Sequence, residues 1–203
     1  MTNTLGKKCV LLASEFWVSG HFRDFPVCLG CYQPCEPEEL CPKCFLPLCR
    51  ECMKSSDTVH HEYECQFFSS QGLSLSEDRK KLDPKKLNSA ILPLRILVIK
   101  ATRPDDWARL DRLMDHVEER KTQQPAKWTH VQENVVRFIL DGLGLDKVFT
   151  DQEVNRAYGL VETNAIQSKT VTSSHNKIRY VLGQLFWAKW HRTHGNGSNK
   201  YVV

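Results

Sequence analysis

The sequence lacks any long uninterrupted apolar run. Its most apolar stretch, ILPLRILVIKA, contains Arg95 and Lys100 and is far shorter than the ~20 residues that a membrane-spanning helix needs. The apolar segment near the N-terminus is interrupted by Ser14 and Glu15, so it does not match a secretory signal. We therefore expect no membrane association and a reducing compartment, the nucleus or the cytoplasm.

A strong charge of either sign is also absent. Lys and Arg number 28 and Asp and Glu number 24, which gives a formal net charge of +4 over 203 residues. Proteins that bind nucleic acid usually carry a larger positive excess. Basic clusters at 79–81 and 85–86 and the stretch WAKWHRTHG make a nucleic-acid contact one alternative. The mild charge does not favour it, and the clusters are more typical of a solvated surface.

Cysteine is absent after Cys65, and this absence divides the sequence. Eight of the nine cysteines lie between Cys28 and Cys65, and Cys9 stands apart. A reducing compartment and an odd count argue against a disulfide framework. A thioredoxin-type redox site would need a strand–helix–strand context that this segment does not show. The cysteine-rich segment is therefore predicted to bind metal.

The cysteines occur in pairs with the spacing typical of zinc ligands. Three Cys-x2-Cys pairs are followed by a His-x3-Cys pair, and the predicted ligands are Cys28, Cys31, Cys41, Cys44, Cys49, Cys52, His61 and Cys65. Eight sulfur and imidazole donors suffice for two tetrahedral zinc sites. A segment of about forty residues cannot usually bury enough surface to fold unaided, whereas structural zinc contributes roughly 10–16 kcal/mol per site. We predict two structural Zn2+ ions.

Three residues near this pattern need a separate assignment. His60 adjoins His61, but only His61 has the three-residue spacing to Cys65 that places both donors on one face of an α-helix, so we prefer His61. Cys35 lies between the first two pairs and is interpreted as a bystander thiol. Cys9 is interpreted as a small buried residue.

Downstream of the cysteines, the hydrophobic pattern becomes helical. Apolar residues recur at helical spacing from Leu87, and Pro93 in this segment suggests a late helix start or a kink. Pro104, followed by two aspartates, favours the start of a second helix, whose apolar face runs from Trp107 to Val117.

Two further helices follow in the pattern. The third begins near Trp128 and is predicted to stop near Gly142 and Gly144. Thr150 and Glu153 have the spacing of a capping box and predict the start of the fourth. The apolar stripes are interpreted as the core of a small helical bundle.

The order of the predicted ligands resembles one class of zinc finger. The histidine is seventh of the eight, unlike its place in RING and PHD fingers. With the helical Cys-Arg-Glu-Cys…His…Cys ending, residues 28–65 resemble the MYND finger and the related HIT-type finger. In MYND fingers the two sites interleave. The resemblance implies one zinc ion on Cys28, Cys31, Cys49 and Cys52, and the other on Cys41, Cys44, His61 and Cys65.

The finger and the helices together resemble the SET-and-MYND (SMYD) protein-lysine methyltransferases, most closely their arthropod-type members. The resemblance covers roughly residues 6–166. It is carried by CLGCYQP, CPKCFLPLCRECMKSS, ILPLRILVIKATRPDDWARLDRLMDHVEER, WTHVQENVVRFILDGLGLD and VNRAYGLVETNAI. It implies strands that lead into the finger and helices inserted within a SET domain. A HIT-finger protein would not be expected to carry this helical region.

This resemblance implies S-adenosylmethionine-dependent methylation of lysine in histones or other proteins, and a link to transcription and chromatin. In the family an asparagine after the inserted helices lines the cofactor pocket, and it maps onto Asn164. The Gly-x-Gly loop and the Asn-His-Ser-Cys motif of that pocket have no counterpart here, and after Ile166 we find neither cysteine nor strands that align with the SET core. We therefore expect a truncated member with no catalytic residues of its own.

The remaining function expected of the chain is binding. MYND fingers bind short proline-containing peptides, and by this resemblance Leu46, Pro47 and Gln66 lie on or beside the binding surface. The alternative is a fragment of an active lysine methyltransferase.

The predicted fold is a small zinc-stabilised α+β module followed by a mainly α-helical bundle. The expected boundaries are partial SET strands at 1–27, the finger at 28–65, a linker at 66–86, the helical region at 87–166 and a divergent tail at 167–203.

Overall fold

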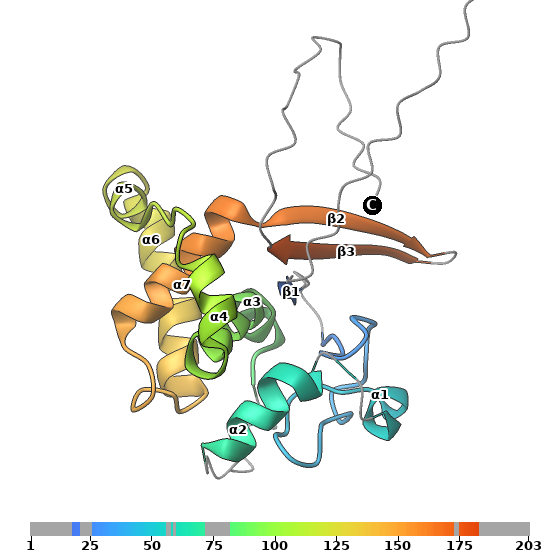
Figure 1. Cartoon of the computed structure of the whole chain (residues 1–203). Helices are drawn as coiled ribbons and strands as arrows, with labels where there is room; N and C mark the ends of the chain where they lie inside the picture. The colour runs from blue at the N-terminus through green and yellow to red at the C-terminus, as the bar shows by residue number, and fades with distance from the viewer. Residues whose placement is uncertain are drawn as a thin grey trace, which may run out of the picture.

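The computed structural model describes residues 18–20, 26–55, 58, 60–71, 82–172 and 175–182 of the chain. Within these residues a cysteine-rich module lies beside a group of helices, and a β-hairpin extends from the last helix (Figure 1). The prediction of a small cysteine-rich module followed by a mainly helical region is confirmed. Cys9, the basic cluster at 79–81 and the aromatic stretch at 187–195 lie outside the described residues.

The cysteine-rich module is built from two equivalent turns. The amide of Tyr32 donates to the Cys28 carbonyl at 2.9 Å, and the amide of Phe45 donates to the Cys41 carbonyl at 2.8 Å. Tyr32 and Phe45 both adopt left-handed backbone angles, with φ of 62° and 53°. Each turn therefore reverses the chain directly after a Cys-x2-Cys pair. Isolated β-bridges close the two loops, Val27 with Pro34 and Leu40 with Pro47.

Short helices complete the module. Helix α1 (Arg50–Lys54) starts at Cys49, the π-helix η1 covers His61–Cys65, and α2 (Gln66–Ser70) continues directly from it. Phe67 and Phe68 of α2 are buried in the core. The structure thus differs from the sequence prediction at the start of the linker, because two adjacent aromatic side chains leave water here and extend the helix beyond Cys65.

Helix α3 (Pro84–Thr102) is the central helix of the chain. The Asp83 side chain caps it by accepting from the Lys85 amide at 2.9 Å, and Pro84 occupies the first turn, where its missing N–H costs nothing. The helix continues through Pro93 rather than starting late. Every residue from Leu87 to Ile99 except Ser89 is buried, as expected of a helix that is surrounded on all sides.

The second predicted helix is divided in two. Helix α4 (Pro104–Leu110) begins at the predicted proline, but the chain then turns, and α5 (Val117–Gln123) starts afresh. The break lies before α5, where His116 has a left-handed φ of 51°. The Asp115 carboxylate accepts from the Val117 amide at 3.1 Å and supports this turn.

The last helices agree more closely with the sequence. Helix α6 (Pro125–Val131) passes into the π-helices η3 (Gln132–Val136) and η4 (Phe138–Gly142), and the segment ends at the predicted glycines. Gly144 has a φ of 68°, which a side chain would disfavour. The capping box of α7 (Asp151–Asn164) is confirmed: Thr150 accepts from the Glu153 amide, and the Glu153 side chain accepts from the Thr150 amide.

A three-stranded antiparallel sheet joins distant parts of the chain. β1 (Val18–Gly20) pairs with β3 (His175–Leu182), which also pairs with β2 (Ile166–Thr172), in the order β1-β3-β2. The register aligns Val18 with Leu182 and Ile166 with Val181. The structure therefore has strands where the sequence analysis identified only a divergent tail. The cysteine-rich module and every helix that the structure describes lie between β1 and β2 in the sequence.

In the part of the chain that the structure describes, no helix combines the length and the apolar character needed to cross a membrane.

Candidate metal centre

The first group of potential ligands comes from one turn and one helix end. Cys28 and Cys31 belong to the first turn of the module, Cys49 caps α1, and Cys52 lies within that helix. The four Sγ atoms lie within 4.8 Å of one another, and those of Cys31 and Cys49 are 3.9 Å apart. The Cys49 amide donates to the Cys28 sulfur at 3.3 Å, which fixes the turn to the helix.

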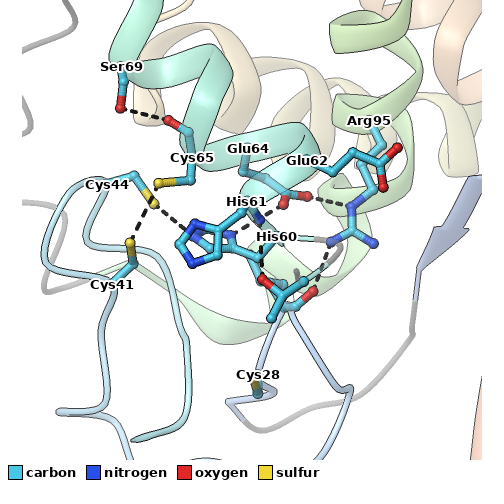
Figure 2. A network of polar contacts seen from close by, with 12 residues as sticks. Cys28, Cys41, Cys44, His60, His61, Glu62, Glu64, Cys65, Ser69 and Arg95 are labelled. Atoms are coloured by element: carbon cyan, nitrogen blue, oxygen red, sulfur yellow. Dashed lines mark hydrogen bonds and ion pairs between the residues drawn. The ribbon is translucent and has the colours of Figure 1, made fainter. Parts of the chain in front are cut away.

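The second group combines the other turn with η1. It consists of Cys41, Cys44, His60 and Cys65, all buried, with their donor atoms within 4.8 Å of one another. The Sγ atoms of Cys41 and Cys65 are 3.8 Å apart, and Cys44 Sγ lies 3.1 Å from His60 Nε2. Figure 2 shows these four side chains converging, with Cys28 set apart from them.

The structure brings His60, and not the predicted His61, together with the cysteines. His60 is fully buried and belongs to the group, whereas His61 is only partly buried and lies outside it. His61–Cys65 is a π-helix, whose wider turn brings a residue five positions before Cys65 nearer to the ligand face than an α-helix would. His60 is five residues before Cys65 and can therefore join the group.

The other seven predicted ligands all lie in the two groups, and the grouping is the interleaved one. The first and third Cys-x2-Cys pairs come together, as do the second pair and the His/Cys pair. All eight described cysteines are free thiols. Cys35 belongs to neither group, in line with its interpretation as a bystander.

The distances between donors fit zinc. Two sulfurs on a tetrahedral ion at Zn–S distances near 2.3 Å stand about 3.8 Å apart, close to the separations in both groups. The backbone at Gly30 supports the same conclusion, because a Cβ built there would lie 2.9 Å from Cys52 Sγ. The turn therefore holds a glycine where a ligand sulfur approaches the backbone.

The pKa values of the thiols in the first group are shifted in opposite directions. A hydrogen bond from Cys31 lowers the pKa of Cys28 to about 4 against the effect of burial, and the same bond raises the pKa of Cys31. Burial, followed by the charge on Cys28, raises the pKa of Cys52 to about 12. Crowded thiolates repel one another, so the full set becomes anionic only when a cation offsets the charge.

The second group shows the same imbalance. A hydrogen bond from Cys44 lowers the pKa of Cys41 to about 3, while burial raises the pKa of Cys65 to about 11. Burial disfavours the charge on His60, but the neighbouring Cys41 and Glu64 side chains outweigh it and raise its pKa to about 9. This set of sulfur and imidazole donors suits a divalent ion such as Zn2+.

Such sites support structure rather than reaction. Each group offers four protein donors, which fill a tetrahedral coordination sphere and leave no position for water or substrate. A metal bound here would fix the two turns, α1 and η1 to one another. The arrangement can stabilise a folded module and can present its surface.

The remaining predicted residues occupy other positions. Asn164 ends α7, and its amide nitrogen donates to the carbonyls of Met114 at 2.8 Å and Leu160 at 2.9 Å. Leu46 is completely buried, so it supports the module from beneath and cannot contact a peptide. Pro47 is partly buried and Gln66 is exposed.

Two charged residues that the sequence analysis missed lie next to the second group. Glu64 and Arg95 are both fully buried and form an ion pair. Glu64 lies between two ligands in sequence, and Arg95 stands in the most apolar stretch of the chain. A charged residue within an apolar run is the only sequence signal for this pair.

Comparisons with known proteins found no relative, so a proposal of function has to rest mainly on the geometry of the two groups. No family model matches the sequence, no curated protein is significantly similar to it, and no solved structure is significantly similar to it.

Proposed function

We propose that this chain is a SMYD-like protein whose MYND-type zinc module mediates protein–protein interaction in the nucleus or cytoplasm, in a role linked to transcription or chromatin. The observation that carries the proposal is the pair of interleaved groups, each with four protein donors. Closed sites of this kind hold a small module in shape. The activity of such a module lies in the surface that the metal maintains.

The partner suggested by the resemblance is a short proline-containing peptide. Gln66 is exposed directly after Cys65, Pro47 is partly exposed three residues after Cys44, and Leu46 is buried. Pro42 and Lys43 are exposed in the turn between Cys41 and Cys44. The shape of this surface is expected to depend on the metal, because the turn and η1 both contribute ligand side chains to this group.

Methyl transfer receives less support from the described residues. Asn164 is the one cofactor-pocket residue that the resemblance maps onto this chain, and its amide nitrogen is engaged by two backbone carbonyls. Methyl transfer also needs a cofactor and a lysine amine held in line within a dry channel. We therefore place the binding function first.

The test is peptide binding by the zinc-loaded full chain. A display library of proline-containing peptides is screened, and the selected peptide is then measured by fluorescence anisotropy. Binding is expected to disappear with EDTA, to be lost in Cys44→Ser, which removes a ligand of the second group, and to persist in Cys35→Ser, which removes a thiol outside both groups. Gln66→Arg is expected to weaken binding while both zinc ions remain bound. A folded, zinc-loaded chain that selects no peptide contradicts the proposal.

A second candidate function is supported by the sheet. β1 precedes the metal module and pairs with β3, which follows all the helices, so the module and the helices form one long insertion in a sheet. This order is what the SMYD resemblance implies for part of an S-adenosylmethionine-dependent lysine methyltransferase. Isothermal calorimetry with S-adenosylmethionine tests it: measurable heat of binding supports this candidate, and none from the folded chain rejects it.

A further inference from the structure

An ion pair is buried where the core is most apolar. The side chains of Glu64 and Arg95 are both fully buried. Arg95 is the largest fully buried side chain of the described residues and lies on α3 among leucines and isoleucines. Removing such a pair from water costs several kcal/mol per ion, so its place in the core requires favourable contacts on every side.

Arg95, on α3, contacts the first turn of the cysteine-rich module, which carries Cys28 and Cys31. Its Nη2 donates to the Leu29 carbonyl at 3.0 Å, and its Nη1 donates to the Tyr32 hydroxyl. Leu29 lies between Cys28 and Cys31, and Tyr32 directly follows them. The guanidinium carbon also lies 5.5 Å from the centre of the Tyr63 ring in η1. One side chain of α3 therefore holds the turn that supplies half of the first group.

Glu64 connects the same arginine to the second group. One carboxylate oxygen accepts from Arg95 Nε, and the other lies 3.3 Å from His60 Nδ1. His60 Nδ1 and this second oxygen are two of the four buried polar side-chain atoms that make no hydrogen bond among the described residues. The opposite ring nitrogen, Nε2, faces the Cys44 sulfur. Figure 2 shows the chain of contacts from Cys44 through His60 and Glu64 to Arg95.

This arrangement fits a metal-bound histidine. When Nε2 binds a metal, the proton of the neutral ring resides on Nδ1, and a carboxylate is a common acceptor for it. The unsatisfied oxygen of Glu64 stands in position for that bond. Arg95 Nε in turn donates to the other oxygen of Glu64, so the ion pair fixes the direction in which the carboxylate faces His60.

We infer that Glu64 and Arg95 form a positioning pair that couples both metal sites to α3, so that metal binding and docking of the helical region onto the module are one transition. The inference rests on the zinc binding proposed above, and it extends the effect of zinc from the module to the helical region. Removing metal releases His60 and the first turn, and Arg95 then loses the partners that compensate its burial.

The first test measures metal affinity in the full chain. Cobalt(II) is titrated into wild type, Glu64→Gln and Glu62→Gln, and its absorption bands report the ligands around the ion. Glu62 is the matched control, since it lies two residues away in η1 and pairs with Arg103 at 2.8 Å rather than with a ligand. Glu64→Gln is expected to weaken the second site by about 10- to 100-fold and to shift its bands. Glu62→Gln is expected to match wild type.

The second test measures coupling. Amide hydrogen exchange is followed in η1 and α3 with and without EDTA. In wild type, chelation is expected to accelerate exchange in both. In Arg95→Met, whose apolar side chain can fill the same space, chelation is expected to accelerate exchange in η1 only. Arg95→Lys, which keeps the charge, is expected to restore part of the response in α3.

The outcomes separate this inference from the proposed function. Equal cobalt affinity in Glu64→Gln and Glu62→Gln, or exchange in wild-type α3 that ignores chelation, overturns the positioning pair. Two bound ions and intact coupling without any peptide binding overturn only the interaction proposal. A folded wild type that takes up no metal overturns both.

Discussion

His60 is completely enclosed, and each of its ring nitrogens faces a single partner. A buried imidazole between a sulfur and a carboxylate can bind metal through one nitrogen and donate through the other. His61, its neighbour, remains partly exposed. The two histidines therefore make a natural pair for comparison.

The first prediction concerns this pair. His60→Ala is expected to lose the second zinc ion and retain the first, because the second group then has three donors around a cavity. His61→Ala is expected to retain both ions. Zinc content is measured by atomic absorption after dialysis against a weak chelator. Loss of zinc in His61→Ala with retention in His60→Ala would reverse the assignment.

The second prediction concerns Gly30. Its substitution by alanine places a methyl group 2.9 Å from Cys52 Sγ, and a sulfur bound to metal cannot move away. Gly30→Ala is expected to lower zinc affinity at the first group by at least about 10-fold, a loss of roughly 1.4 kcal/mol, and to leave the second group unchanged. Competition with a chromophoric chelator measures both affinities. The control is Gly142→Ala, where the nearest atom is a side-chain carbon of Phe138 at 3.2 Å. Equal affinities in Gly30→Ala and wild type would contradict the account.

At the scale of elements, the sequence predicted a helix start correctly where the stabilising hydrogen bonds join residues within one turn. Thr150 and Glu153 bind each other's backbone within one turn, so their spacing alone predicts the start of α7. The preference for His61 assumed an α-helix before Cys65, whereas the turn adopts π geometry and His60 is the histidine that lies with the cysteines. That choice depends on packing beneath η1, which the local sequence does not encode.

The third prediction concerns the start of α7. Glu153 pairs with Lys100 of α3 at 2.7 Å, in addition to its role in the capping box. Glu153→Gln retains the cap, since glutamine also serves there, and removes the ion pair. We expect a loss of about 0.5 kcal/mol in unfolding free energy at pH 7, measured by urea unfolding with zinc present. Glu153→Ala is expected to lose about 1 kcal/mol more, because it also removes the side chain's hydrogen bond with the Thr150 amide.

The ion pair also sets a pH dependence. The bond from Lys100, then that from the Thr150 backbone, lowers the pKa of Glu153 below 4.5. A lowered pKa stabilises the folded state above the unfolded value, and the contribution is lost as pH falls through the folded value. The difference between wild type and Glu153→Gln is therefore expected to be constant from about pH 8 to pH 5 and to shrink below about pH 4.5. A difference that grows on acidification would contradict this.

At the scale of the whole molecule, the features that the sequence did not predict depend on contacts between residues far apart in the chain. The cysteine spacing predicted seven of the eight donors, because ligands must lie close to one ion. Arg95 could not be predicted as a contact of the metal module, since its partners lie 31 to 66 residues away in sequence. Strands β2 and β3 were missed as well: β3 pairs with its neighbour β2, but its other edge pairs with β1, which is far away in sequence, and local sequence does not reveal that contact.

The interleaving of the two sites is the central claim, and one measurement tests it directly. Native mass spectrometry counts zinc ions on the full chain and on two double variants after dialysis against a competing chelator. Interleaved sites predict two ions on wild type, one on Cys28→Ser/Cys49→Ser and none on Cys28→Ser/Cys41→Ser. Sites formed in sequence order predict the reverse for the two variants, and that result, or a folded wild type without zinc, would contradict the account.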